Sequence, residues 1–151
     1  MNVYDFDDTI YHGDSTFDFY KFCLKKKPSV IFCFPVITAL RFVLGFEKKL
    51  VFKERFYRFL TCFSDVDTLV EDFWKTHIKN VKDWYKTQHK EDDVIISASP
   101  EFLLTPACRI LGIRHLMASR VNKRTGKYTG ENCWGEEKVL EVDGGDGCTI
   151  V

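Results

Sequence analysis

The sequence lacks the usual signals of several common functional classes. Its 22 Lys and Arg residues balance 22 Asp and Glu residues, so it has no excess of the basic charge that nucleic-acid binding usually requires. No two cysteines form a CxxC pair, and no two histidines have the spacing of metal ligands. The run GGDG is a weak glycine signal that predicts a loop, not a dinucleotide motif. We therefore expect no nucleic-acid partner.

The first residues also lack the pattern of a secretory leader, because a short apolar run is followed directly by acids. We therefore expect a cytoplasmic protein. Disulfides require an oxidising compartment, so all the cysteines are predicted to be reduced thiols. The six cysteines are Cys23, Cys33, Cys62, Cys108, Cys133 and Cys148.

Aromatic residues and a local basic block are what the chain has in abundance. Phe occurs 14 times in 151 residues and 45% of the residues are apolar, which predicts one domain with a strongly aromatic core or pocket. Ten basic residues lie between positions 21 and 58, where only Glu47 and Glu54 oppose them. This basic block is a local feature of a chain with no net charge.

The periodicity predicts an α/β fold with a parallel sheet and a helical insertion after the first strand. Ser64 or Asp65 is expected to cap a helix whose apolar face runs from Val70 to Trp84. Ser99 is expected as the N-cap of another helix, with Pro100 at its first position and Gly112 after its end. In chain order we expect a strand at 3–6, a helical block at 14–90, strands at 94–96 and 115–119 around a helix at 100–111, a hairpin at 125–126, a helix at 136–142 and a strand at 148–151.

Residues 29–46 form a stretch that is nearly long and apolar enough for a transmembrane helix, but Pro35 and Arg41 interrupt it. The stretch fits a buried helical hairpin, a surface that dips into a bilayer or a true span. Lysines at 25–27 and 48–49 fit attraction to anionic lipid headgroups as well as ordinary solvation. Peripheral membrane contact through residues 25–49 is therefore one hypothesis for this region.

Polar side chains with catalytic chemistry follow the first two predicted strands. Asp5 and Asp7 end the first strand, and Ser97 and Ser99 end the second. Ligands bind beyond the carboxyl ends of strands in open α/β sheets. Two carboxylates one residue apart can act as nucleophile and as general acid and base, and their oxygens suit Mg²⁺. With Lys138 as a compact positive charge, these residues predict a phosphoryl-transfer site.

Three motifs carry a resemblance to a known family. "DFDDT" resembles the first motif of haloacid dehalogenase-like phosphatases, "SAS" the second, and the lysine of "GEEK" the third. The helical block lies where this family inserts its C1 cap, and "TGKYTGENCWGEEK" is similar to the subclass that includes phosphoserine phosphatase. The resemblance implies a Rossmann-like core formed by 1–13 and 91–151, with an α-helical cap at 14–90.

The resemblance also implies roles for single residues. Asp5 would attack phosphorus and form an aspartyl-phosphate, and Asp7 would protonate the leaving alcohol and then activate water. Asp5 and the backbone carbonyl of Asp7 would hold Mg²⁺, and Thr9 would order the first loop. Ser97 and Lys138 would bind the phosphate. The residues expected around the substrate are Ser97, Ala98, Thr9 and Ser99.

One part of the family pattern is not found in these 151 residues. The resemblance implies a fourth motif with one or two metal-binding acids, often GDSxxD, after the next strand. If residues 148–151 are that strand, the motif would begin beyond Val151, and the C-terminal part of the core would be missing. Asp143 or Asp146 could also stand in for the missing acid.

The sequence leaves alternative functions open. The main expectation is a Mg²⁺-dependent phosphomonoester hydrolase acting on a small phosphate ester. A lipid-phosphate phosphatase at the membrane surface is an alternative, because the basic, apolar cap is similar to that of phosphatidylglycerophosphatase C-type enzymes. A catalytically impaired binding module that keeps the fold is another. A two-component receiver domain fits poorly, because no Asp ends the strand at 94–96.

Overall fold

The computed structural model describes residues 2–33, 43–45 and 49–129 of the chain, and these form an α/β fold. The predicted helix at 136–142, the predicted strand at 148–151 and most of the apolar stretch at 29–46 lie outside the described residues. Across the described residues, no helix has the length and apolar character needed to cross a membrane.

The sheet among the described residues has three parallel strands in the order β1–β2–β3. They are β1 (Val3–Tyr4), β2 (Val94–Pro100) and β3 (His115–Ser119). The predicted parallel arrangement is therefore confirmed, and the predicted bounds of the third strand are correct. The first strand is shorter than predicted because pairing with β2 ends at Tyr4, and Phe6 turns fully into the core.

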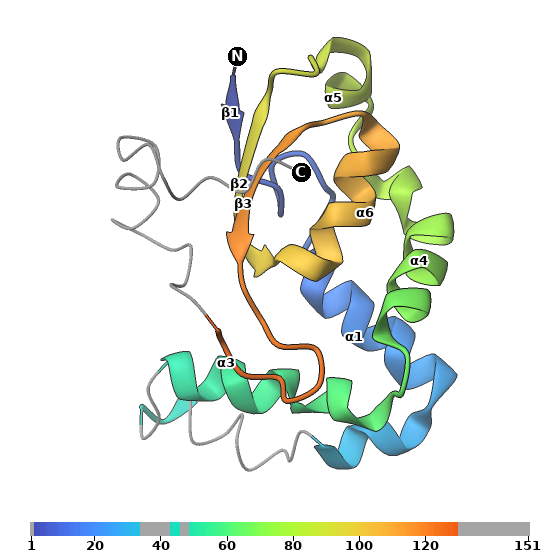
Figure 1. The fold of residues 1–151 in the computed structure, drawn as a ribbon, viewed down its shortest axis with the longest axis vertical. Coiled ribbons are helices and arrows are strands. Elements are labelled where there is room, and N and C mark those ends of the chain that lie inside the picture. The colour runs from blue at the N-terminus through green and yellow to red at the C-terminus, as the bar shows by residue number, and fades with distance from the viewer. Residues whose placement is uncertain (1, 34–42, 46–48, 130–151) are drawn as a thin grey trace.

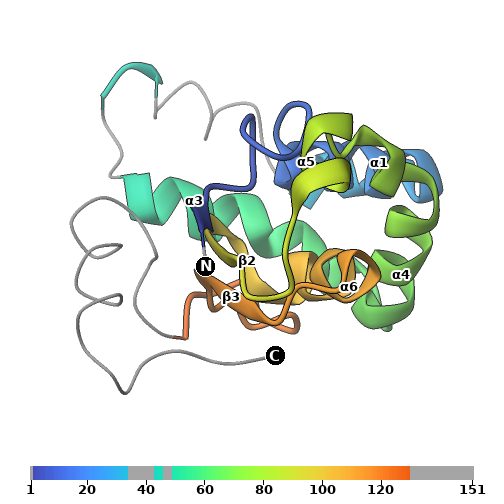
Figure 2. The ribbon, with the colours of Figure 1, turned by 90° about the horizontal axis from the view of Figure 1, so that it is seen from above.

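Helices connect and cover the strands, mainly on one side of the sheet (Figures 1 and 2). Helix α6 joins β2 to β3, and α4 packs against α6. Figure 1 shows α3 beyond the carboxyl ends of the strands, where a ligand site of an α/β sheet is expected. The helices are α1 (Ser15–Lys26), α3 (Lys49–Tyr57), α4 (Val66–His77), α5 (Asp83–Gln88) and α6 (Glu101–Leu111), with 3₁₀ helices η1 (Pro28–Cys33), η2 (Arg58–Cys62) and η3 (Ile78–Asn80).

Side-chain caps and one glycine set the ends of these helices. The Asp14 side chain accepts a hydrogen bond from the N–H of Phe17 (2.8 Å) and begins α1. Asp65 accepts from the N–H of Thr68 (3.0 Å) and begins α4, as predicted. Gly112 ends α6 with a φ of 72°, a left-handed conformation that glycine adopts without strain.

Two predictions about helix ends are wrong. Ser99 does not cap α6, because it lies within β2 and Pro100 is the N-cap. The apolar face predicted from Val70 to Trp84 does not belong to one helix, because α4 ends at His77 and α5 begins at Asp83. Sequence periodicity cannot distinguish one long helix from two short ones in the same phase.

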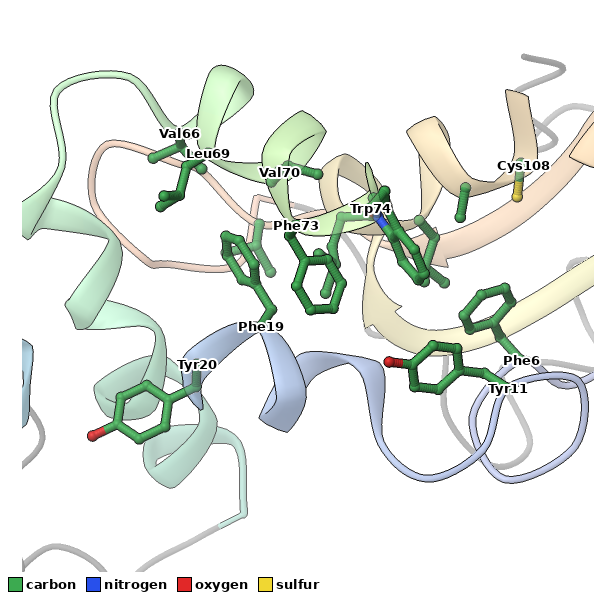
Figure 3. Close-up of a cluster of buried hydrophobic side chains, with 14 of the residues drawn as sticks. Phe6, Tyr11, Phe19, Tyr20, Val66, Leu69, Val70, Phe73, Trp74 and Cys108 are labelled. Carbon is green, nitrogen blue, oxygen red and sulfur yellow. The ribbon is translucent and has the colours of Figure 1, made fainter. Parts of the chain in front are cut away.

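The hydrophobic core is aromatic, as the composition predicted. It joins the Rossmann-like region to the helical block (Figure 3). Phe6 and Tyr11 follow β1, and both rings contact Trp74 of α4, with centroids 6.0 and 5.7 Å away. The Trp74 indole N–H donates to the Leu103 carbonyl of α6 (2.6 Å). Phe73 then packs on Phe19 of α1. One hydrophobic cluster therefore spans both regions.

Cys33 and Cys62 form a disulfide that links η1 to η2. The prediction of six reduced thiols is wrong for this pair, because folding of the helical block brings together two cysteines that are 29 positions apart. Cys23 and Cys108 are free and buried. Burial raises the pKa of both thiols to about 12, so they are protonated at neutral pH. Cys133 and Cys148 lie outside the described residues.

Candidate active site

The loop after β1 holds the acidic motif at the carboxyl edge of the sheet. The N–H groups of Ile10 and Tyr11 both donate to the Phe6 carbonyl (3.0 and 2.9 Å). The Lys82 N–H donates to the Ile10 carbonyl (2.8 Å), which ties the loop to α5. Asp8 has a φ of 59°, a left-handed conformation that Asp tolerates better than most residues. The loop therefore turns tightly enough for Asp5 and Asp7 to share one cavity.

The second motif lies on an irregular part of β2. Ser97 pairs with Ala118 and Pro100 pairs with Ser119, so two residues of β2 are inserted opposite adjacent positions of β3. A bulge of this kind changes the direction of side chains, often beside an active site. As a result three consecutive residues, Ser97, Ala98 and Ser99, line the same cavity.

The two motifs meet in a cavity of about 460 Å³ between the strand ends and the helical block. This volume is in the range of small-molecule sites. The strand ends supply carboxylates and hydroxyls, and α1 and α3 supply the opposite wall. The lining residues are Asp5, Asp7, Asp14, Thr16, Phe17, Phe52, Lys53, Phe56, Tyr57, Ser97, Ala98 and Ser99.

Asp7 is half-buried, and both of its carboxylate oxygens are held. Oδ1 accepts the backbone N–H of Ser15 (2.7 Å), and Oδ2 accepts the hydroxyl of Ser99 (2.5 Å). Burial raises the pKa of Asp7, although the hydrogen bonds from Ser99 and Ser15 partly offset it. A carboxyl group with a raised pKa carries a proton at higher pH than an ordinary Asp. It is therefore suited to act as a general acid.

The serines of the second motif are buried and joined to each other and to α1. The Ser99 N–H donates to Ser97 Oγ (3.1 Å), which fixes the Ser97 hydroxyl at the cavity floor. Ser99 Oγ lies 2.9 Å from Thr16 Oγ1. Asp5 is more exposed than Asp7, and its Oδ1 accepts the N–H of Phe6 (2.9 Å). Asp5 is thus the carboxylate that is more accessible to a ligand.

The wall opposite the strand ends is aromatic and carries a positive charge. Phe52, Lys53, Phe56 and Tyr57 come from α3, and Phe17 comes from α1. The Phe56 ring packs on Tyr57 with a centroid distance of 5.5 Å. Burial raises the pKa of Tyr57 well above its ordinary value, so this hydroxyl stays neutral. The wall can therefore contact an apolar group and an anion.

The cavity brings together most of the residues predicted from the sequence. Asp5, Asp7, Ser97, Ala98 and Ser99 all line it. Thr9 is exposed and is not among the lining residues, so a role in binding stays a prediction. Lys138 lies outside the described residues.

Sequence reasoning missed the residues that the helical block contributes. Phe52 and Phe56 were visible as a helical stripe, but the pattern did not show that this stripe faces the acids. Asp14, Thr16, Phe17, Lys53 and Tyr57 had no local signal, because their place depends on how α1 and α3 pack over the strand ends.

The donor atoms at the cavity floor fit part of a Mg²⁺ shell. Mg²⁺ is often bound through one or two carboxylates, with water and substrate phosphate completing its coordination. Asp5 supplies one carboxylate, and Asp7 supplies a backbone carbonyl on the same loop. The described residues contain no group of three or more His, Cys, Asp and Glu residues able to hold a metal ion. These residues therefore fit a Mg²⁺ site in which water and substrate would supply the remaining ligands.

A second cavity, of about 520 Å³, lies between α4, α6 and the segment after β3. Its charged side chains are engaged with one another: Arg109 contacts Glu71 (3.4 Å), Arg120 contacts Glu101 (3.5 Å) and Lys123 contacts Asp67 (2.5 Å). Neither Asp5 nor Asp7, the predicted catalytic residues that the structure describes, lines it. The chemistry is thus concentrated at the strand ends.

Comparison with known proteins identifies the family. The family model of haloacid dehalogenase-like hydrolases matches residues 3–147. The chain belongs to this family, as the three motifs predicted.

Individual relatives match less of the chain. A probable phosphatase and an uncharacterised protein, both from Mycobacterium tuberculosis, are 44% identical over 54 residues, which is 34% of this chain and 19% of each relative. The match thus spans about a fifth of the length of these curated relatives.

One solved structure shares the fold, and a second is less similar. A protein of unknown function from Bordetella pertussis Tohama I has a TM-score of 0.77 at 20% identity, over 94% of this chain and 71% of that one. A phosphoserine phosphohydrolase-like protein from Francisella tularensis has a TM-score of 0.46 at 20% identity, over 86% and 64%.

Proposed function

We propose that the protein hydrolyses phosphate monoesters through a phosphorylated Asp5, with Mg²⁺ as cofactor. The observation that carries this proposal is the cavity in which Asp5, Asp7 and Ser97 meet. The Asp5 carboxylate is accessible. The Asp7 carboxyl group is half-buried and hydrogen-bonded, and its pKa is raised. Two carboxyl groups in such different surroundings can take two different roles in acid–base chemistry.

The two acids divide the reaction between them. A carboxylate oxygen of Asp5 attacks phosphorus, and the bond from phosphorus to the ester oxygen breaks. Asp7 gives its proton to that oxygen, so the alcohol leaves as a neutral molecule. Water then attacks the phosphorus of the Asp5 phosphate while Asp7 takes a proton from it. Phosphate leaves, and both acids return to their starting states.

The remaining groups hold the transferring phosphate. Ser97 lines the cavity, and its hydroxyl is proposed to donate a hydrogen bond to a phosphate oxygen. Lys138 is proposed to balance the phosphate charge, as the family motif implies. Bound Mg²⁺, held by Asp5 and the Asp7 carbonyl, would neutralise negative charge on the phosphate. Positioning and charge stabilisation of this kind carry most of phosphoryl-transfer catalysis.

Hydrolysis of 4-nitrophenyl phosphate in the presence of Mg²⁺ tests the proposal. We expect turnover by the wild-type chain and loss of turnover on chelation of the metal. Asp5→Asn should abolish activity, because an amide is a poor nucleophile. Asp7→Asn should lower kcat by about 10²- to 10⁴-fold for an ester with a poor leaving group. If Asp5→Asn turns over at the wild-type rate, the proposal is wrong.

The leaving group is proposed to be a small alcohol with an apolar portion. The wall that faces the acids carries the rings of Phe17, Phe52 and Phe56, and Lys53 adds a positive charge. This composition favours an ester whose alcohol combines apolar surface with an anionic group.

A lipid phosphate is the second candidate, and the exposed end of the helical block favours it. Phe32 in η1 is 83% exposed and Ile31 is also exposed. Lysines at 25–27 precede this 3₁₀ helix and also lie at the surface. Apolar side chains beside lysines suit contact with an anionic membrane.

Co-sedimentation with vesicles separates the two candidates. If the substrate is a lipid phosphate, the protein should sediment with anionic vesicles and not with neutral ones. Phe32→Ser should then reduce binding while hydrolysis of 4-nitrophenyl phosphate continues. No sedimentation with either vesicle, together with turnover of soluble esters, would leave the small-substrate proposal standing alone.

A further inference from the structure

Three side chains form a continuous hydrogen-bonded row from the helical block to the buried acid. Thr16 Oγ1 lies 2.9 Å from Ser99 Oγ, and the Ser99 hydroxyl contacts Asp7 Oδ2. Thr16 is 9% exposed and Ser99 is 6% exposed. Water therefore has little access to either hydroxyl. The Tyr57 hydroxyl is a further hydrogen-bond partner of Thr16.

The number of protons fixes the direction of this row. A hydroxyl group has one proton to donate. When Asp7 is ionised, Ser99 gives its proton to the carboxylate, so Thr16 must be the donor to Ser99. When Asp7 carries a proton on Oδ2, that proton points to Ser99, and both hydroxyls turn to donate in the opposite direction. The row can thus hydrogen-bond to Asp7 in its ionised and in its protonated form without a change in the positions of the carbon and oxygen atoms.

The two hydroxyls come from different parts of the fold. Thr16 is the second residue of α1, in the helical block, and Ser99 is the next-to-last residue of β2, in the sheet. The Ser15 N–H, also from α1, holds the other oxygen of Asp7. The orientation of the carboxyl group therefore depends on where α1 lies relative to β2.

We propose that Ser99 and Thr16 are positioning residues that aim Asp7 at the oxygen of the leaving group. This inference rests on the proposed function, because it assigns a task to residues that support the acid. Neither hydroxyl needs to touch phosphorus. Their contribution is orientation, and a small misplacement of a catalytic group can cost a large factor in rate.

The proposal makes a prediction that depends on the leaving group. Nitrophenolate is a stable anion and leaves phosphorus with little need for a proton. Phenolate is more basic and gains more from protonation by Asp7. If the Asp7 carboxyl group is no longer oriented toward the leaving-group oxygen, hydrolysis of phenyl phosphate should therefore slow more than that of 4-nitrophenyl phosphate. These two esters differ little in size, so both should bind the same wall.

The test compares kcat/KM for the two esters in Ser99→Ala, Thr16→Val and Thr16→Ser. We expect Ser99→Ala and Thr16→Val each to lower kcat/KM about tenfold for phenyl phosphate and less than twofold for 4-nitrophenyl phosphate. Thr16→Ser keeps the hydroxyl and should restore the wild-type ratio. The double variant Ser99→Ala/Thr16→Val should lose no more kcat/KM than Ser99→Ala alone, because Ser99→Ala already breaks the hydrogen-bonded row.

Thr105→Val is the matched control. Its hydroxyl donates to the Glu101 carbonyl within α6 (2.8 Å), and Thr105 does not line the cavity that holds the acids, so neither ester should be affected. Equal losses for both esters in Ser99→Ala, with an unchanged melting temperature, would overturn the proposal while leaving phosphatase activity established. A wild-type chain that hydrolyses neither ester would instead overturn the proposed function, and this inference with it.

Discussion

At the residue scale, Asp7 combines partial burial with hydrogen bonds to both of its carboxylate oxygens. A half-buried carboxylate is disfavoured relative to one in water, and the hydrogen bonds from Ser99 and Ser15 only partly offset this cost. Functional sites commonly keep such groups at the expense of stability. The same burial that raises the pKa of Asp7 keeps this carboxyl group protonated to a higher pH than an ordinary Asp.

Replacing Asp7 with Asn should stabilise the protein at neutral pH. Because the pKa of Asp7 is raised by folding, the folded state binds more protons than the unfolded state between the two pKa values. The contribution of Asp7 to the free energy of unfolding is therefore greatest below the ordinary Asp pKa of 3.8. It falls as the pH rises through the pKa of Asp7 in the folded state. Asn stays neutral, and its amide can keep contacts to Ser15 and Ser99.

Urea unfolding in metal-free buffer at pH 3 and pH 7 checks this expectation. Asp7→Asn should have a higher free energy of unfolding than the wild type at pH 7, and the difference should disappear at pH 3. A variant that is less stable than the wild type at pH 7 would show that the carboxylate is favoured by its surroundings.

At the element scale, the shortness of β1 makes its anchors important. Only Val3 and Tyr4 pair with β2, yet this strand must present Asp5 to the cavity. The fully buried Asp93 side chain accepts from the Asn2 N–H (3.1 Å), the Asn2 side-chain amide (3.0 Å) and the Lys90 N–H (2.9 Å). The Asp93 carboxylate therefore holds the start of β1 next to the start of β2 through these hydrogen bonds.

Asp93→Ala should lower the free energy of unfolding by about 2–4 kcal/mol, because three donors lose a buried, charged acceptor. Chemical denaturation followed by circular dichroism measures this change. Asp83→Ala is the control: the Asp83 side chain is 96% exposed and pairs with Lys86, so its loss should cost less than about 1 kcal/mol. Equal effects of the two substitutions would refute the anchoring role of Asp93.

The parts of the site that the sequence could predict are those set by local patterns. The apolar run before Ser97 and the acids after Tyr4 identified strand ends, and Gly112 marked the end of α6. The bulge that turns Ser97, Ala98 and Ser99 into one cavity could not be predicted, because it depends on pairing with β3. The lining from α3 and the Cys33–Cys62 disulfide also depend on tertiary packing.

At the scale of the whole molecule, the site lies where two regions with one shared core meet. Phe6 and Tyr11 of the sheet region contact Trp74 of the helical block (Figure 3). The cavity wall from α3 is thereby held opposite the acids. The sheet supplies the carboxylates and serine hydroxyls of the cavity, and the helical block supplies the wall that we propose contacts the leaving group.

The most direct test of the account is to locate phosphate on the protein during turnover. The wild-type chain is mixed with a phosphate monoester and Mg²⁺, quenched in acid and digested, and the peptides are analysed by mass spectrometry. The account predicts a phosphoryl group on Asp5 that is absent from Asp5→Asn. Steady hydrolysis without phosphorylation of Asp5, or with phosphate on another residue, would contradict it.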